Sequence, residues 1–242
     1  MNHEVENKTV LITGAAGGLG AALSLQCARA GFNTVMLDKD SRGLNAAWDE
    51  MIEQGLPEPV LHPLDLSTAG TADFEKLVTA LESNFSGLDG LIHCAARFGG
   101  LRPLDQIEPA EWLHQVQVNL NAAWLLSVSC LPLLRQSSQS FLYFLLEDMQ
   151  KMKGPFWGGY GVTKHALQAL VGQLAAECET SPLQVLGIIP GPMATTLRAE
   201  AWHAENPTTQ AAPALVAGEI MKLISGEIKT SNPIVNLPQP MS

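Results

Sequence analysis

The chain has 242 residues, 46% of them hydrophobic and only 16% charged, which is enough apolar material for one large core. A formal net charge of −10 argues against nucleic acid or an anionic membrane surface as partner. It does not exclude a nucleotide, because backbone amides and a helix N-terminus can hold phosphate.

The N-terminal segment Met1–Lys8 is polar and acidic, so we do not expect a signal peptide, and no apolar run has the length of a membrane span. Four cysteines are scattered without the spacing of a metal site: Cys27, Cys94, Cys130 and Cys178. They are typical of buried thiols in a reducing compartment. We therefore expect a cytoplasmic protein with no metal, folded as one domain over residues 1–242.

Strand-like and helix-like patterns alternate along the chain. The expected strands are Thr9–Ile12, Thr34–Leu37, Val60–Leu64, Gly90–Cys94, Ser140–Leu146, Gln184–Ile189 and Ile234–Asn236. The expected helices are Leu19–Ala30, Arg42–Gln54, Thr71–Asn84, Ala110–Leu134, Gly161–Glu179 and Ala214–Ile224. The alternation predicts an α/β fold with a doubly wound parallel sheet of about seven strands and helices on both faces. In such folds, ligands bind outside the carboxyl ends of the strands.

The first strand is followed by the sequence T-G-A-A-G-G-L-G, with glycines at Gly14, Gly18 and Gly20, and then by a helix. Strand, glycine turn and helix together point backbone N–H groups at a phosphate, although a tight turn without a ligand gives the same pattern. The acidic residue Asp38 ends the second strand, about 20 positions later, where a carboxylate can bind both ribose hydroxyls of an adenosine. The alternative for Asp38 is an ordinary turn carboxylate.

Two further strand ends carry candidate residues. Asp65 closes the third strand, where it either accepts from an adenine amino group or caps the following turn. The fourth strand ends in His93-Cys94-Ala95-Ala96, whose small residues let a loop lie against a flat ring. We assign no chemistry to His93, because a lone histidine here is more often a satisfied turn residue.

The long central helix contains two asparagines, Asn119 and Asn121, in an apolar setting. A buried amide needs hydrogen-bond partners, so either residue is a candidate for linking this helix to a neighbouring segment. Further on, Tyr160 and Lys164 are one helical turn apart. An ammonium beside a phenol lowers the phenol pKa, and this predicts Tyr160 as a general acid/base near neutral pH.

Taken together, these motifs make the chain resemble the short-chain dehydrogenase/reductase family from Thr9 to about Asn236. Within it, L-D-G-L-I-H-C-A-A and C-L-P-L-L-R are similar to the YciK-like bacterial oxidoreductases. The resemblance implies a Rossmann-type sheet, a nicotinamide cofactor (NAD or NADP), and hydride transfer to or from a small or medium carbonyl or alcohol. It implies that Tyr160 exchanges the proton, that Lys164 holds the nicotinamide ribose, and that Asn119 holds a water. The cofactor residues it implies are Gly14, Gly17, Gly18, Leu19, Gly20, Asp38, Asp65, Leu66, Ala95, Lys164, Pro190, Gly191 and Thr195, with a substrate loop at about 192–213.

The family's catalytic serine belongs about 13 residues before the tyrosine, where this chain has Glu147. No Ser or Thr occurs between Phe141 and Gly159, so a shift of alignment does not restore it. An ionised Glu147 would oppose negative charge on the reacting oxygen and raise the Tyr160 pKa, whereas a neutral one could donate a hydrogen bond to that oxygen. A third alternative is that Glu147 points away and pairs with Lys151 or Lys153.

Two functions follow from this departure. The first is an NAD(P)-dependent oxidoreductase that retains catalysis, and the second is a nucleotide-binding sensor or structural subunit that has lost it.

Asp38 favours NAD over NADP, since its charge would repel a 2′-phosphate. The apolar helices 110–134 and 161–179 favour a homodimer or homotetramer. The sequence also places Trp157, Met193 and Trp202 as candidates for an apolar pocket lining or for ordinary packing.

Overall fold

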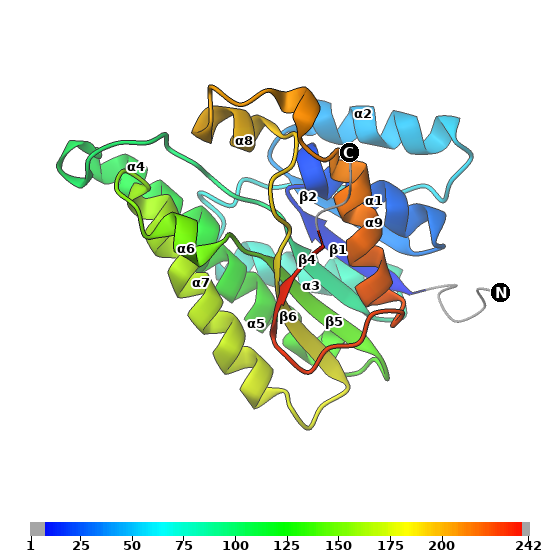
Figure 1. The fold of residues 1–242 in the computed structure, drawn as a ribbon. Helices are drawn as coiled ribbons and strands as arrows, with labels where there is room; N and C mark the ends of the chain where they lie inside the picture. Colours follow the sequence, from blue (N-terminus) through cyan, green and yellow to red (C-terminus); the bar gives the residue numbers. More distant parts are fainter. Residues whose placement is uncertain (1–7, 239–242) are drawn as a thin grey trace.

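The computed structural model describes residues 8–238, so the N-terminal segment predicted not to be a signal peptide lies almost entirely outside it. Within this range the chain forms one parallel seven-stranded sheet in the order β3-β2-β1-β4-β5-β6-β7 (Figure 1). The strands are β1 (Thr9–Thr13), β2 (Asn33–Asp38), β3 (Val60–Pro63), β4 (Gly90–His93), β5 (Ser140–Leu145), β6 (Leu183–Ile189) and β7 (Ile234–Asn236). The doubly wound parallel sheet predicted from the alternating pattern is thus confirmed.

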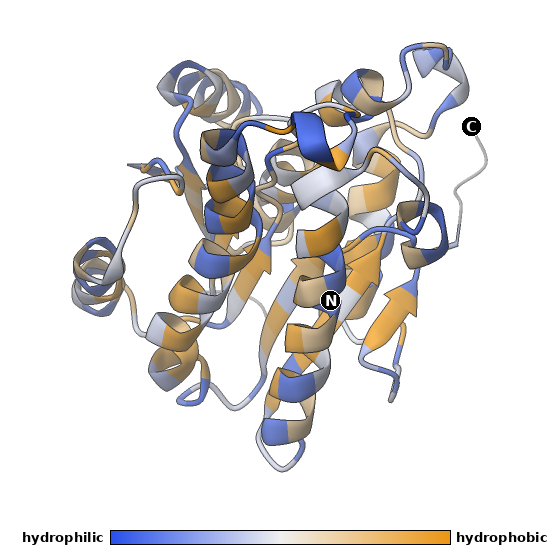
Figure 2. Cartoon of the chain, turned by 90° about the vertical axis from the view of Figure 1, so that its left-hand side faces the viewer, coloured by the Kyte–Doolittle hydropathy of each residue, from blue (hydrophilic) through white to orange (hydrophobic). Residues whose placement is uncertain are grey.

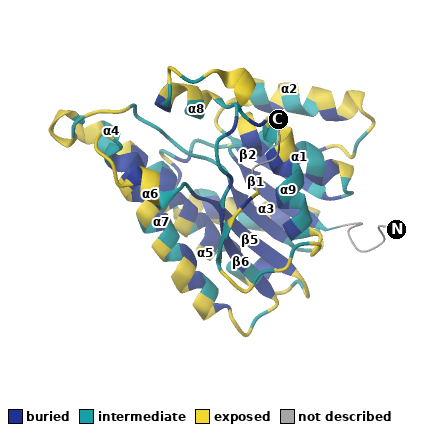
Figure 3. Ribbon diagram, viewed as in Figure 1, coloured by how far each residue is buried: buried dark blue, intermediate teal, exposed yellow. Residues whose placement is uncertain are grey.

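Helices cover both faces of the sheet, and the outer surfaces of these helices are the exposed ones (Figures 1 and 3). They are α1 (Gly18–Arg29), α2 (Ser41–Glu53), α3 (Thr71–Asn84), α4 (Pro109–Val116), α5 (Ala122–Leu134), α6 (Met149–Met152), α7 (Gly158–Glu177), α8 (Thr196–Ala201) and α9 (Pro213–Ile224). Residues of α3, α5 and α7 form one apolar core with the sheet, and residues of α1, α2 and α9 form the other. Leu11 of β1 lies in the first core and its neighbours Val10 and Ile12 in the second, as expected for a strand buried on both faces.

The long helix predicted over Ala110–Leu134 is continuous, but it contains a π-helical turn at Gln117–Asn121 between α4 and α5. The whole run, Pro109–Leu134, has the length and mean hydropathy of a membrane span, which corrects the expectation that no such segment exists. Its inner side is core: Leu126 and Cys130 are fully buried against the sheet. Length and composition alone are therefore weak evidence for a membrane location.

Three local differences from the expected elements affect the site. Helix α7 begins at Gly158 instead of Gly161, which places Tyr160 in its first turn. The short helices α6 and α8 were not predicted. Helix α8 lies inside the segment expected to be a loop, and the Thr195 hydroxyl caps it by accepting from the Arg198 N–H at 3.2 Å.

Candidate active site

The strand order reverses between the parallel neighbours β1 and β4, since β2 and β3 lie on one side of β1 and β4 to β7 lie on the other. A cavity of about 630 Å³ opens at this point, at the carboxyl ends of the strands. All thirteen predicted cofactor residues line it, and so do Tyr160 and Glu147. This position is the general ligand site of doubly wound sheets.

The glycine loop fits a pyrophosphate because three of its glycines leave no space for a side chain or need a left-handed backbone. Gly14 has φ +69°, and a Cβ there would lie 2.7 Å from the backbone nitrogen of Ala95. A Cβ on Gly20 would lie 2.1 Å from the carbonyl oxygen of Gly14. Gly18 has φ +54° and begins α1, whose N-terminus faces the cavity. The residues present therefore fit a dinucleotide held by backbone amides and the helix dipole.

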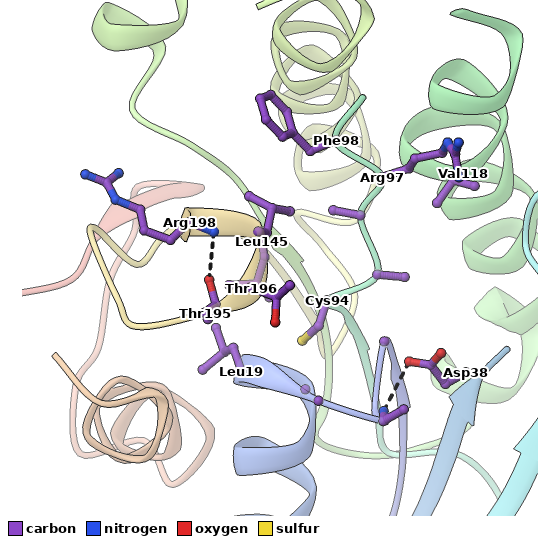
Figure 4. A pocket seen from close by; sticks show the side chains of 18 of the residues that line it. Leu19, Asp38, Cys94, Arg97, Phe98, Val118, Leu145, Thr195, Thr196 and Arg198 are labelled. Atoms are coloured by element: carbon purple, nitrogen blue, oxygen red, sulfur yellow. Dashed lines mark hydrogen bonds between the residues drawn. The ribbon is translucent and has the colours of Figure 1, made fainter. Parts of the chain in front are cut away.

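Asp38 and Asp65, the two acidic residues predicted to contact an adenosine, both line the cavity. The Asp38 carboxylate accepts from the N–H groups of Ala16 (3.1 Å) and Asp40 (3.0 Å), and Figure 4 shows the first of these bonds. Asp65 accepts from the Ser67 N–H at 2.9 Å, and this bond lowers the pKa of its carboxyl. Asp65 thus caps the following turn, and the same residue also lines the cavity.

Asn119 is the buried asparagine of the predicted pair, whereas Asn121 is exposed. Its Oδ1 accepts from the Arg97 N–H at 2.7 Å, and its Nδ2 donates to the Arg97 carbonyl at 3.0 Å and to Thr163 Oγ1 at 3.1 Å. Asn119 therefore brackets the loop after β4 to helix α7. It does not line the cavity itself, and its π-helical turn is a type often found at functional sites.

Tyr160 and Lys164 lie on the first turns of α7 and are both almost fully buried. The Lys164 ammonium lies 5.6 Å from the centre of the Tyr160 ring and donates to the carbonyl of Leu145 at 2.7 Å. Burial and the neighbouring Glu147 carboxylate raise the pKa of Tyr160 well above its ordinary value. This direction is the opposite of the one predicted from Y-x-x-x-K, because the desolvation of the phenol and the charge of Glu147 outweigh the effect of Lys164.

Glu147 follows β5 and points at the hydroxyl of Tyr160: Tyr160 Oη donates to Glu147 Oε1 at 2.8 Å. The alternative that Glu147 turns away to a lysine is not observed. Lys151 pairs with Asp148 instead, and Lys153 donates to Gln150. A carboxyl, and not a serine hydroxyl, is thus the hydrogen-bond partner of Tyr160 at the end of β5.

His93 ends β4 and is buried with a hydrogen-bond partner for its ring, which agrees with the prediction that it has no catalytic role. Its Nε2 lies 2.8 Å from Ser127 Oγ, and its ring stacks on Phe144 at a centroid distance of 4.8 Å. Burial, together with the Lys164 charge, lowers the pKa of His93 to about 3, so the imidazole is neutral at physiological pH.

Several lining residues were missed by the sequence reasoning, notably Arg97 and Phe98 after β4 and Arg198 on α8 (Figure 4). The signal that could have found α8 is Thr195, a capping residue directly before T-L-R-A-E-A. Met193 and Trp202 line the cavity, as suggested for an apolar pocket. Trp157 is absent from the lining and packs against Trp202 at a centroid distance of 5.0 Å.

Comparison with known proteins agrees with this geometry. The short chain dehydrogenase family matches residues 8–206. The chain is 30% identical over 210 residues to the oxidoreductase YciK of Escherichia coli K12, covering 87% of this chain and 83% of YciK. It is also similar to the solved structure of a short chain dehydrogenase from Pseudomonas syringae (TM-score 0.91, 30% identity, 98% and 96% of the two chains covered).

A second solved structure, a short chain dehydrogenase from Escherichia coli CFT073 complexed with NADPH, is similar with a TM-score of 0.87, 29% identity and 93% of each chain covered. The chain therefore belongs to the short-chain dehydrogenase family and is an NAD(P)-dependent oxidoreductase.

Proposed function

We propose that the protein transfers a hydride between a nicotinamide cofactor and a small or medium substrate of the carbonyl/alcohol type, with Tyr160 as general acid. The observation that carries this proposal is the position of the Tyr160 hydroxyl on the same cavity that the glycine loop borders. A bound nicotinamide nucleotide would supply or accept the hydride. Because the pKa of Tyr160 is raised, its phenol is protonated at neutral pH and suited to donate to a substrate oxygen.

The other residues support this step. Lys164 uses one of its three donors on Leu145, so the ammonium has donors for ribose hydroxyls. Asn119 fixes the loop that carries Arg97, and we assign it the water-holding role only as part of this proposal. Residues 192–213, including α8, would cover the substrate. The whole described chain would act as one domain around its single sheet.

The direct test combines nucleotide titration with a turnover assay. We expect the purified protein to bind NADH or NADPH by calorimetry and to consume it with members of a panel of aldehydes and ketones. The relationship to oxidoreductases supports catalysis over a purely nucleotide-sensing subunit. Absence of nucleotide binding would refute the proposal. Nucleotide binding without any hydride transfer would instead favour the sensor.

We infer that NAD is preferred over NADP, since the Asp38 carboxylate at the ribose end would repel a 2′-phosphate. We expect NADH to bind at least about tenfold more tightly than NADPH, about 1.4 kcal/mol in binding free energy. Asp38→Asn should narrow this difference, because it removes the charge and keeps a similar shape. The matched control is Asp40→Asn, since asparagine can still cap α2 and the NADH preference should persist. Tighter NADPH binding by the unmodified protein would refute the role given to Asp38.

We also propose a cytoplasmic homodimer or homotetramer that pairs through the helices of the α4, α5 and α7 layer. Its outer surface exposes Leu113, Trp124, Val128 and Val162, and Figure 2, viewed from that side, shows apolar turns along these helices. The four free cysteines are in keeping with a reducing compartment.

We expect a dimer or larger species in sedimentation velocity, and a shift toward monomer for Trp124→Lys, because a charge would be buried in the interface. The matched control is Leu215→Lys, which adds the same charge on α9, on the other face. A monomer at all concentrations would contradict the assembly.

A further inference from the structure

The catalytic end of the cavity carries a carboxylate that no ion pair neutralises among residues 8–238. Glu147 takes part in none of the ion pairs of this part of the chain, and its hydrogen-bond partner is the Tyr160 hydroxyl. The cavity's arginines are both occupied elsewhere. Arg97 binds Glu111 through two nitrogens, at 2.9 and 2.5 Å, and Arg198 binds Glu205 in the same way, at 2.7 and 2.5 Å.

Lys164 is therefore the cation that Glu147 most directly offsets. The two charges interact, since Glu147 raises the pKa of Lys164 against the lowering effect of burial. With a serine at position 147, the Lys164 charge would act alone on the reacting atoms and would favour a developing oxyanion. With Glu147 in place, a carboxylate opposes the Lys164 charge and lies within a hydrogen bond of the Tyr160 hydroxyl.

The net charge of the reacting group in the transition state then decides which substrate suits the site, since kcat/KM depends on the transition state relative to the free substrate. A neutral ketone carries partial negative charge on oxygen in the transition state, and the Glu147 carboxylate disfavours that charge. A protonated imine still carries part of its positive charge in the transition state, and a neighbouring carboxylate stabilises that charge and orients the bound cation. Resting on the proposed hydride transfer, we propose that this site takes cationic carbon–nitrogen double bonds, protonated imines or iminium ions, in preference to neutral ketones.

The step balances without a proton donor. A hydride from the reduced nicotinamide forms the new C–H bond, the C=N π pair moves onto nitrogen, and the products are the amine and the oxidised nucleotide. No proton has to leave Tyr160, so its raised pKa and its bond to Glu147 do not impede this reaction. For a ketone, the same bond to Glu147 must be broken or shared before Tyr160 can donate to the substrate.

The aromatic surface beside Glu147 suits a flat cation. Phe98 lines the cavity (Figure 4), and its ring meets the Tyr160 ring edge to face at a centroid distance of 5.3 Å. An aromatic face next to a carboxylate is a common recognition surface for organic cations. The Trp202 ring is less suited to this role, because the Arg198 guanidinium already lies 3.4 Å from its centre.

The test compares N-methyl-dihydroisoquinolinium, which is permanently charged, with tetralone, a neutral ketone of similar size, each corrected for the rate without protein. We expect kcat/KM for the iminium to exceed that for the ketone at least about tenfold. Glu147→Gln should lower the iminium value about tenfold or more and leave the ketone value unchanged or higher. Glu147→Ser provides a second variant, and it should shift the preference toward the ketone.

Glu177→Gln is the matched control, because it removes the same charge from an exposed residue at the far end of α7 that does not line the cavity. It should change neither substrate's kcat/KM. A binding readout accompanies the kinetics: the amine product N-methyl-tetrahydroisoquinoline, titrated into the protein with oxidised nucleotide, should bind at least about tenfold more weakly to Glu147→Gln.

The outcomes separate this inference from the proposed function. If neither NADH nor NADPH binds, the proposed function fails. If nucleotide binds and the ketone is reduced faster than the iminium, or if Glu147→Gln leaves iminium turnover and amine binding unchanged, only the cationic preference is overturned. Binding of nucleotide with reduction of neither probe would overturn the cationic preference, while the proposed function would still be decided by the panel of aldehydes and ketones. Equal losses in Glu147→Gln and Glu177→Gln would show that a change in overall charge, and not the contact made by Glu147, causes the loss, and would also overturn the inference.

Discussion

Replacing Tyr160 with phenylalanine is expected to lower kcat for carbonyl reduction at least about 100-fold, because the proton donor is lost. Nucleotide affinity should change by no more than about threefold, since the phenyl ring keeps its contact with Phe98 and the glycine loop is not altered. Steady-state kinetics and calorimetry on the same preparation measure both quantities. If the assignment is wrong, the variant will retain its turnover.

The chain supplies a matched control for this experiment, because it has only two tyrosines. Tyr143 on β5 is fully buried away from the cavity, and its hydroxyl donates to Gln184 Oε1 at 2.5 Å. Tyr143→Phe removes one hydroxyl of the same kind and should leave kcat unchanged. In that variant the tyrosinate absorbance reports Tyr160 alone.

The raised pKa of Tyr160 predicts at which end of the pH range activity is lost. The protonated phenol is the active form for reduction, so activity dependent on it should not fall until the pH exceeds about 10, the ordinary range of tyrosine. Glu147→Gln removes a negative charge and should move both the alkaline limb and the tyrosinate midpoint to lower pH. If Tyr160 in the Tyr143→Phe protein titrated with a midpoint near neutral pH, Lys164 would lower the Tyr160 pKa as the sequence predicted, and the raised pKa would be wrong.

Replacing Gly20 with alanine is expected to damage stability and nucleotide binding together. A Cβ at this position would lie 2.1 Å from the carbonyl oxygen of Gly14, which is backbone and cannot rotate away. Helix α1 and the glycine loop must therefore separate, at a cost of about 1–3 kcal/mol in the free energy of unfolding. Because the displaced amides form the phosphate site, nucleotide affinity should fall at least about tenfold.

Gly17→Ala is the control in the same loop. Its φ of −170° is ordinary extended backbone, and no atom lies within 4 Å of an added Cβ. Its free energy of unfolding should remain within about 0.5 kcal/mol of the unmodified protein in urea titrations. Equal stability and equal nucleotide affinity for both alanine variants would show that the close packing of Gly20 on Gly14 does not hold the loop.

The arrangement of elements follows from local sequence to a large extent. Short apolar runs and helical spacing predicted all seven strands and the six long helices, because both signals depend on residues only a few positions apart. The glycines after β1 and the acidic residue that ends β2 likewise located part of the cavity lining. Helix α8 was missed because its six residues carry too weak a periodic signal, and the first turn of α7 was missed because its two glycines read as a loop.

What the sequence determined by itself is the fold and the position of Tyr160, Lys164 and Glu147 along it, since periodicity and spacing are written in the order of residues. Only the tertiary structure decided how these three groups act on one another. It placed the Glu147 carboxyl on the Tyr160 hydroxyl, directed Lys164 to the Leu145 carbonyl, and buried the phenol. The direction of a pKa shift depends on desolvation and on charges brought close by folding, and these distances are not encoded in the spacing of residues along the chain.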